Sequence, residues 1–239
     1  MIIIPARLAS TRFEKKVLTL VDGTPMVIAT ALRVKEIDEV VIATDSNEVM
    51  ELARKYGIKA ILTKSSHPSG TDRVFEAAQK LELKDSDLIL NVQADEPFIE
   101  KEVVQALYDE INRNRNLDWF MASCYKEISK EEAKSENQVK VVIDKNSDSI
   151  YFSRALVPFD RDGKRDIYYG HLGLYGFNFK SLKTFCTLLP SFLENSEKLE
   201  QLRALSYGYK IKMIKVKSQS IGIDTKEDLI RSLKLFASK

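Results

Sequence analysis

The feature that most constrains the fold is an alternation of short apolar segments with helix-like segments through the first half of the chain. Apolar runs typical of buried strands occupy residues 2–4, 40–43, 58–62 and 88–92. Helical patterns follow them, beginning near residues 24–25 and 46–47 and covering 71–83 and 101–114. Strands that alternate with helices in this way form βαβ units around a parallel sheet. The sequence therefore predicts an α/β fold with a mostly parallel sheet.

Residues with strong local preferences indicate where several of these elements begin and end. Pro5 lacks a backbone N–H, so we expect it to end the first strand. Thr24, which precedes a proline, and Thr71 are both expected to act as helix N-caps. Gly57 is expected to stop the helix that Ser46 or Asn47 begins.

The second half of the chain shows a different pattern. Turn-forming residues at 145–148 separate apolar runs at 139–143 and 149–152, which predicts a hairpin. A long strand rich in tyrosine and glycine is expected over 168–177. We interpret residues 119–179 as antiparallel additions to the sheet, with a possible contact between subunits.

The end of the chain returns to the alternating pattern. We predict a helix over 199–207, a strand over 211–216 and a closing helix over 225–236 that Thr225 caps. The chain contains no internal repeat, low-complexity tract or clear linker. We therefore expect a single domain over residues 1–239.

Composition and missing motifs exclude several classes of protein. With 37 Lys and Arg against 35 Asp and Glu, the chain lacks the concentrated positive charge of a general nucleic-acid binder. Its two cysteines, Cys124 and Cys186, form no disulfide framework, and no apolar run approaches the roughly 20 residues of a membrane span. We therefore expect a cytoplasmic protein that binds neither nucleic acid nor membranes. The G-x-G-x-x-G and P-loop motifs are absent, and His67 and His171 have no zinc-site spacing with the cysteines.

The loop after the first strand carries Arg7, Arg12 and Lys16, together with the hydroxyls of Ser10 and Thr11. In a parallel α/β sheet such a loop lies at the carboxyl edge, where ligands bind. This pattern is typical of a polyphosphate site. On this segment alone, an ordinary solvated loop with scattered charges is an equally good explanation.

Two carboxylates are expected at the same edge of the sheet. Asp95 follows the strand at 88–92, and Asp224 lies between a predicted strand and the closing helix. Mg²⁺ prefers one or two protein carboxylates together with substrate phosphates and water. Taken alone, Asp95 is slightly better explained as a turn residue before Pro97. Together with the basic loop, the two carboxylates favour a metal–polyphosphate site.

The segment HPSGTDR at 67–73 is a small-residue loop that runs into a helix, where backbone N–H groups can hold a phosphate or a base. Arg73 falls in the first helical turn, where the helix dipole favours an acid, so we expect it to face an anion. His171 and Tyr175 share one face of the long strand, and a half-buried aromatic face is the simpler explanation for them.

Taken in order, the motifs resemble a known family. They are IPARLASTR, HPSGTDR, NVQADEP, VKVV, YFSRA, VPFDRD, HLGLYGF, LEQLRAL and GIDTKEDL, and they extend from residue 2 to about residue 231. In this arrangement the sequence is similar to the 3-deoxy-manno-octulosonate (Kdo) cytidylyltransferases. The resemblance implies a Rossmann-like sheet of the nucleotide-diphospho-sugar transferase type with a small antiparallel hairpin lobe. It also implies a homodimer, and transfer of CMP from CTP to Kdo with Mg²⁺, for lipopolysaccharide biosynthesis.

The resemblance also assigns roles by position. It implies that Mg²⁺ is ligated by Asp95 and Asp224, which with Lys16 form the catalytic set. The residues that would bind the nucleotide and its phosphates are Arg7, Arg12, Lys16, Arg73 and Gln93. Those that would hold the sugar are Arg154, His171, Tyr175, Glu200 and Gln201.

Two positions depart from the family pattern, and two other functions stay open. Glu14 and Lys15 stand where the family usually has Pro-Gly, and Ala94 replaces a glycine, which would be strained if this position needs a positive φ. One alternative is a cytidylyltransferase for another acidic sugar, 8-amino-Kdo or a nonulosonic acid. The other is a non-catalytic nucleotide-binding domain, which would require the loss of a metal carboxylate.

Overall fold

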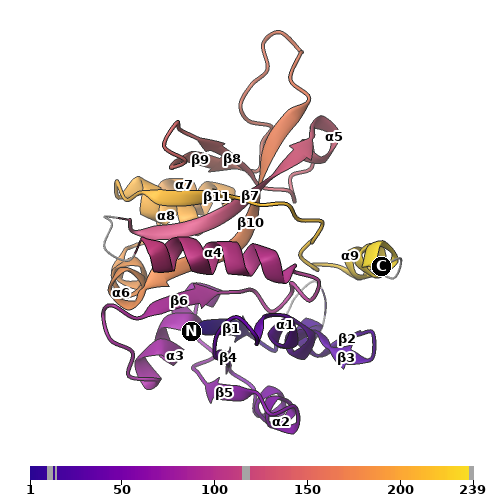
Figure 1. The fold of residues 1–239 in the computed structure, drawn as a ribbon, viewed down its shortest axis with the longest axis vertical. Coiled ribbons are helices and arrows are strands. Elements are labelled where there is room, and N and C mark those ends of the chain that lie inside the picture. Colours follow the sequence, from indigo (N-terminus) through magenta and orange to yellow (C-terminus); the bar gives the residue numbers. More distant parts are fainter. Residues whose placement is uncertain (10–12, 14, 115–118, 237–239) are drawn as a thin grey trace.

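The computed structural model of the protein describes residues 1–9, 13, 15–114 and 119–236. Its centre is a sheet that, within these residues, has nine strands (Figure 1). Neighbouring strands follow the order β11-β7-β10-β6-β1-β4-β5, and β8 and β9 extend from β10. The strands are β1 (Ile2–Ala6), β4 (Val40–Thr44), β5 (Lys59–Leu62), β6 (Leu88–Asn91), β7 (Met121–Ser129), β8 (Lys140–Ile143), β9 (Ser149–Ser153), β10 (Ile167–Asn178) and β11 (Ile211–Lys215).

The predicted parallel sheet is present and is built by the first half of the chain. Strand β1 pairs in parallel with β4 and β6, and β4 pairs in parallel with β5. Strand β10 runs antiparallel to β6 and β7, and β11 runs parallel to β7. A separate two-stranded sheet consists of β2 (Leu20–Val21) and β3 (Thr24–Pro25).

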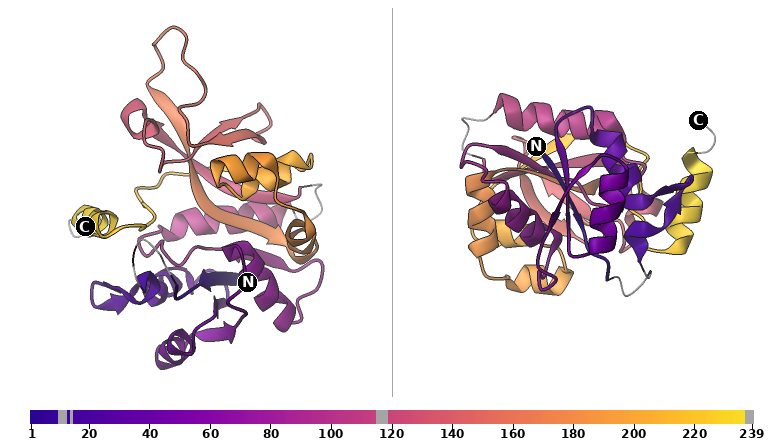
Figure 2. Two further views of the ribbon diagram at one scale, coloured as in Figure 1. Left: turned by 180° about the vertical axis from the view of Figure 1, so that it is seen from behind. Right: turned by 90° about the horizontal axis from the view of Figure 1, so that it is seen from below.

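Helices cover both faces of the sheet (Figure 2). Ile2 and Ile4 pack in one buried cluster with residues of α1 (Met26–Val34), α2 (Asn47–Lys55) and α4 (Lys101–Arg113). Ile3 packs in the other with α3 (Gly70–Lys80), α6 (Phe179–Thr187) and α8 (Gln201–Ser206). Because β1 is buried on both faces, its sequence is an unbroken apolar run instead of an alternating one. The remaining helical segments are η1 (Lys16–Leu18), α5 (Lys130–Ala133), α7 (Phe192–Glu197) and α9 (Lys226–Phe236).

The prediction that Pro5 ends the first strand is wrong. Strand β1 continues to Ala6, and Pro5 pairs with Ala43 of β4. The carbonyls of Met1 and Ile3 accept from the amides of Leu90 and Val92, at and just after β6. Because every second residue of a strand directs its backbone groups to the same neighbour, the nitrogen of Pro5 also faces the β6 side. The pairing with β6 extends only to Ile3, so no ladder bond requires the missing N–H of Pro5.

Two predicted caps are also wrong, and two others are confirmed. Thr24 lies in β3, and Thr71 lies inside α3, whose N-cap is Ser69 accepting from the amide of Asp72. The Ser46 side chain caps α2. Thr225 accepts from the amide of Asp228 at the start of α9.

The predicted hairpin is confirmed as β8 and β9. Figure 1 shows that this hairpin, α5 and the far end of β10 project from the body of the molecule. The predicted antiparallel segment at 119–179 contains more than this lobe, because β7 and part of β10 belong to the central sheet. None of the helices in the described ranges is both long enough and apolar enough to span a membrane.

Candidate active site

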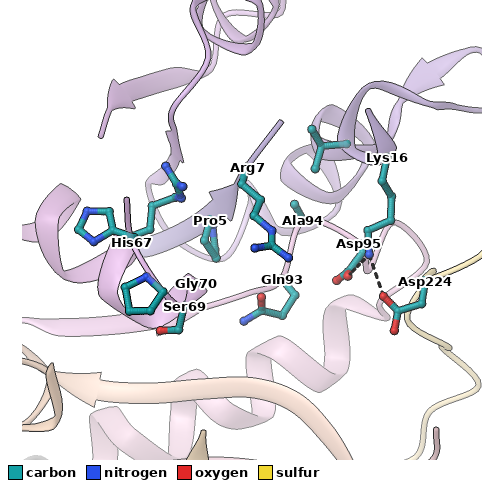
Figure 3. Close-up of a pocket in the computed structure, with 13 residues that line it drawn as sticks. Pro5, Arg7, Lys16, His67, Ser69, Gly70, Gln93, Ala94, Asp95 and Asp224 are labelled. Atoms are coloured by element: carbon teal, nitrogen blue, oxygen red, sulfur yellow. Dashed lines mark hydrogen bonds and ion pairs between the residues drawn. The ribbon is translucent and has the colours of Figure 1, made fainter. Parts of the chain in front are cut away.

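A cavity of about 300 Å³ opens at the carboxyl edge of β1 and β6 (Figure 3). The chain reaches it from four directions: the loop after β1, the segment before α3, the end of β6, and the stretch before α9. Seven nucleotide and metal residues were expected from the sequence, and the structure describes six of them. All six line the cavity: Arg7, Lys16, Arg73, Gln93, Asp95 and Asp224. Arg12 lies outside the described residues.

Lys16 joins the two predicted metal carboxylates. Its Nζ lies 2.7 Å from Asp95 Oδ2 and 2.9 Å from Asp224 Oδ1, although these residues are 79 and 208 positions away in the chain. Burial acts to lower the pKa of Lys16, but Asp95 and then Asp224 outweigh it, so that its pKa is raised. The ammonium is therefore charged, and this single cation bridges the two carboxylates.

Asp224 does not directly end a strand, contrary to expectation. Strand β11 ends at Lys215, and an extended loop then leads toward α9 (Figure 1). The amide of Ile223 donates to the carbonyl of Asp95 at 2.9 Å. This backbone bond places Asp224 opposite Asp95.

Side chains from elsewhere hold the same loop. Glu100 accepts from the hydroxyl of Ser218 and from the amide of Gln219, both at 2.7 Å. Lys126 donates to the carbonyl of Ser220 at 2.9 Å. These three contacts fix the course of the loop before it reaches Asp224.

Glu96 completes this anchor from inside the protein. It accepts from the hydroxyl of Ser220 at 2.7 Å. Burial, and then the neighbouring charge of Asp95, raise the pKa of Glu96 to about 7. Its other oxygen lies 3.1 Å from where a Cβ on residue 222 would stand, so glycine at this position lets the loop approach closely.

Arg73 does line the cavity, but its guanidinium is engaged within the protein. It donates to Asp45 at 2.9 Å and to Thr63 at 2.6 Å, and its side chain is almost fully buried. Asp45 also accepts from the amide of Leu8, in the loop after β1. The anion that Arg73 faces is therefore Asp45, and the ion pair ties α3 to the basic loop.

Arg7 provides the contrasting case. It is exposed and makes no hydrogen bond or ion pair with any described residue. Figure 3 shows its side chain extending from the end of β1 toward Gln93. A Cβ on Gly70 would lie 3.2 Å from Pro5 and 3.4 Å from Gln93, so glycine keeps this part of the cavity open.

The five predicted sugar residues do not line this cavity, and three of them form a buried group beside it. The hydroxyl of Tyr175 donates to Gln201 at 3.1 Å, and Gln201 Nε2 lies 3.5 Å from His171 Nδ1. Ser123, which the sequence did not single out, lies 2.8 Å from His171 Nε2. Burial lowers the pKa of His171 to about 3, so its ring is neutral.

Glu200, which precedes Gln201 in the chain, is linked to the cavity by hydrogen bonds. Its Oε1 accepts from the hydroxyl of Thr71 at 2.8 Å, and burial raises its pKa. Thr71 in turn accepts from Asn91, which accepts from Gln93. A continuous chain of hydrogen bonds thus links the cavity-lining Gln93 to Glu200. The sequence alone does not reveal it, because its members come from strand and helix segments far apart in the chain.

Arg154 lies apart from the other four. Its side chain donates to the carbonyls of Glu197 and Glu136, and its amide donates to the Glu197 carboxylate. In this structure it anchors the segment after β9 to α7.

The two departures from the family pattern have different structural consequences. Lys15 has φ 49°, in the left-handed region, and its ammonium pairs with Glu48 away from the cavity. Glu14 lies outside the described residues. Ala94 is buried and has no positive φ, so the methyl group in place of hydrogen causes no backbone strain there.

Within the described residues, no group of three or more His, Cys, Asp or Glu side chains is arranged to hold a metal ion. The two carboxylates at Lys16 are therefore a partial donor set. A divalent ion bound there would need further oxygen ligands from a substrate or water.

Comparisons with known proteins agree with this geometry. The cytidylyltransferase family model matches residues 1–213. A 3-deoxy-manno-octulosonate cytidylyltransferase from Wolinella succinogenes is 53% identical over 241 residues, covering 99% of each chain. One from Helicobacter pylori strain HPAG1 is 52% identical, covering 99% of this chain and 98% of its own.

Solved structures show the same relationship. A CMP:2-keto-3-deoxy-manno-octonic acid synthetase complexed with CTP superposes with a TM-score of 0.90 at 35% identity, covering 99% of this chain and 98% of the other. A putative glucose-1-phosphate thymidylyltransferase from Bacillus anthracis, at 14% identity and a TM-score of 0.68, shares the Rossmann-like fold. The chain therefore belongs to the cytidylyltransferase family, and within it to the 3-deoxy-manno-octulosonate cytidylyltransferases.

Proposed function

We propose that the protein transfers CMP from CTP to Kdo, releasing pyrophosphate. The observation that carries this proposal is the meeting of Lys16, Asp95 and Asp224 at the cavity on the carboxyl edge of the sheet. An ammonium beside two carboxylates matches the needs of a metal–triphosphate complex. The close relatives carry the name of this activity.

The triphosphate would be held by the cations of the loop after β1. Arg7 is exposed at the cavity, and Lys16 extends into it. Arg12 completes the proposed set. When CTP binds, the Lys16 ammonium would exchange its contacts with Asp95 and Asp224 for contacts with phosphate oxygens. Gln93 would contact the nucleotide, and Arg73 would act by holding the loop through Asp45.

Asp95 and Asp224 fit a bound Mg²⁺, because their oxygens already converge on one cation at 2.7 and 2.9 Å. Two carboxylates plus phosphate and water oxygens are the ligands that this ion prefers. When bound there, Mg²⁺ would neutralise phosphate charge and lower the pKa of the attacking sugar hydroxyl. One or two such ions are compatible with this donor set.

In the reaction, the anomeric hydroxyl oxygen of the sugar attacks the α-phosphorus of CTP. A bond from that oxygen to phosphorus forms, the bond from the α-phosphorus to the bridging oxygen breaks, and pyrophosphate leaves. The hydroxyl proton passes to solvent. The protein's part is to bind and orient both substrates and to balance the charge of the leaving group.

The buried group beside the cavity would hold the sugar. Tyr175, His171 and Gln201 present hydroxyl, imidazole and amide groups, and Glu200, which precedes Gln201 in the chain, bonds to Thr71 on the nucleotide side. We expect His171→Ala and Gln201→Ala to raise the KM for Kdo and to leave CTP binding nearly unchanged. Each lost hydrogen bond should cost roughly 1–3 kcal/mol.

Pyrophosphate release from CTP, measured with Mg²⁺ and with or without Kdo, tests the proposal. We expect release only when both substrates are present, and poor replacement of CTP by ATP or GTP. Equal turnover of every nucleotide would remove the cytidylyl assignment. A panel containing 8-amino-Kdo and a nonulosonic acid would identify the sugar, and preference for either of these over Kdo would contradict our choice.

We further propose that the single domain over residues 1–239 forms a cytoplasmic homodimer through its hairpin lobe. Large apolar side chains on this lobe support the contact: Phe159 is 87% exposed, and Ile150 and Ile167 are also exposed. Light scattering of the protein and of Phe159→Asp should show a dimer and a monomer, respectively. A monomeric wild-type protein would contradict this.

A further inference from the structure

Ser123 lies fully buried in β7, opposite an irregularity in β10. The pairing of β10 with β7 shifts between Leu172 and Tyr175, so that β10 has two extra residues there. As a result, three groups surround the Ser123 hydroxyl. Its Oγ is 2.8 Å from His171 Nε2, 3.2 Å from the carbonyl of Leu172 and 2.8 Å from the carbonyl of Leu174.

These contacts allow only one favourable arrangement of protons. A serine hydroxyl has a single proton to donate, and a carbonyl oxygen can only accept. If the hydroxyl donates to a carbonyl, the closer being that of Leu174, an Oγ lone pair is left facing His171 Nε2. Nε2 must then carry the ring proton and donate it to Ser123.

The opposite arrangement is unfavourable. If Ser123 donated to Nε2, its lone pairs would face two carbonyl oxygens at 2.8 and 3.2 Å with no proton between them. Buried acceptors left without a donor lose the hydrogen bonds that water would supply and gain nothing in return, which decides between the two directions. The bulge of β10 is thus the feature that sets the direction, because it turns both carbonyls toward one hydroxyl.

We propose that Ser123 fixes the Nε2–H tautomer of His171 and so acts as a positioning residue for the sugar. This proposal rests on the function proposed above, in which His171 meets the sugar. The tautomer leaves Nδ1 as an acceptor, directed toward Gln201 Nε2 at 3.5 Å. Gln201 Oε1 is then free to accept from Tyr175.

The surroundings keep the ring neutral. The rings of Phe152 and Tyr175 pack against it, with centroids 4.9 and 5.8 Å away, and within the described residues no carboxylate bonds to it. Burial lowers the pKa of His171, which agrees with this geometry. The Gln201 amide lies 3.5 Å from Nδ1, which is long for a hydrogen bond, so a sugar hydroxyl can take its place as the donor to this fixed acceptor.

¹⁵N NMR of the histidine rings tests the tautomer without any substrate. The chain has only two histidines, and the signals lost in His171→Asn identify this ring. In the wild-type protein we expect Nε2 to be pyrrole-like and Nδ1 pyridine-like. A proton on Nδ1, or a cationic ring at neutral pH, would overturn the proposal whether or not any variant folds.

Ser123→Ala should lose this preference and give averaged shifts, whereas Ser123→Thr, which keeps the hydroxyl, should retain it. Ser149→Ala is the matched control, because Ser149 is also a buried strand serine and its hydroxyl has no hydrogen-bond partner within the described residues. It should leave both the tautomer and the kinetics unchanged. An unchanged tautomer in Ser123→Ala would refute the role of Ser123.

Kinetics complete the test. In Ser123→Ala we expect the KM for Kdo to rise about 5- to 10-fold, the effect of losing one oriented hydrogen bond, with the KM for CTP unchanged. A lost tautomer with an unchanged KM for Kdo would refute the positioning role. Failure of the proposed function itself would look different, because the wild-type protein would then not turn over Kdo at all.

Discussion

Replacing Lys16 with alanine tests the centre of the proposed site. In the structure the Lys16 side chain is 14% exposed, and its ammonium contacts both Asp95 and Asp224. In the proposed complex it contacts the triphosphate instead. Hydrogen bonds between charged groups contribute about 1.5–3 kcal/mol. Since 1.4 kcal/mol is a factor of ten, we expect Lys16→Ala to raise the Kd for CTP by roughly 10- to 150-fold.

Lys15→Ala is the matched control, because it removes the neighbouring positive charge. The Lys15 ammonium is half exposed and pairs with Glu48, away from the cavity. Such surface pairs contribute about 0–1 kcal/mol to stability, so the Kd for CTP should change little. Calorimetric titration of CTP in the presence of Mg²⁺, without Kdo, measures binding in the absence of turnover. An equal or larger effect from Lys15→Ala would refute the assignment of Lys16.

The same pair of variants tests whether the ammonium competes with a divalent ion. Without nucleotide, Lys16 occupies the space between the two carboxylates. Its removal should therefore strengthen Mn²⁺ binding, because a cation no longer has to be displaced. Electron paramagnetic resonance of free Mn²⁺ gives this affinity directly. Weaker Mn²⁺ binding in Lys16→Ala than in Lys15→Ala would contradict the exchange.

Further predictions concern the carboxylates. Asp95→Asn and Asp224→Asn should each abolish most turnover with the circular dichroism spectrum unchanged, since several kcal/mol of charge stabilisation are lost; near wild-type rates at saturating Mg²⁺ would exclude the residue as a ligand. Glu100→Ala should release the loop that carries Asp224 and raise the Mg²⁺ concentration for half-maximal activity several-fold, whereas an unchanged Mg²⁺ dependence would show that the loop holds its course without it. Glu76 tests acid stability: burial acts to raise its pKa, but hydrogen bonds from Lys80, the amide of Lys64 and His67 lower it from 4.5 to about 2. Its stabilising contribution is therefore present above pH 4.5 and lost as the pH falls toward 2, so Glu76→Gln should flatten the unfolding free energy over that range in acid–urea titrations, and an unchanged slope would contradict the shift.

Much of the fold followed from local sequence. The apolar run of β1 and the caps at Ser46 and Thr225 depend on residues close together in the chain, so the sequence predicts them. That the basic loop after β1 and Asp95 after β6 lie at the same edge of the sheet was also predictable, because the carboxyl ends of parallel strands share one edge.

Other features required the tertiary structure. Arg73 was expected to face a ligand anion, but packing of α3 beside β4 supplies Asp45 as its partner. Thr71 was expected to cap a helix, but Ser69 does so and Thr71 contacts Glu200 instead. Such partners are decided by segments far apart in sequence, which no local pattern records.

What the sequence determined by itself is therefore the set of elements, their order around a parallel sheet, and the chemistry of the groups at its edge. These depend on local backbone preferences and on the alternation of apolar segments. What only the tertiary structure decided is which group each polar side chain meets: Lys16 with two carboxylates, Asp224 at the end of an anchored loop, and Ser123 with a bulge of β10. The physical reason is that a polar side chain is stabilised by whichever partner packing brings within hydrogen-bond distance, and packing joins segments far apart in sequence.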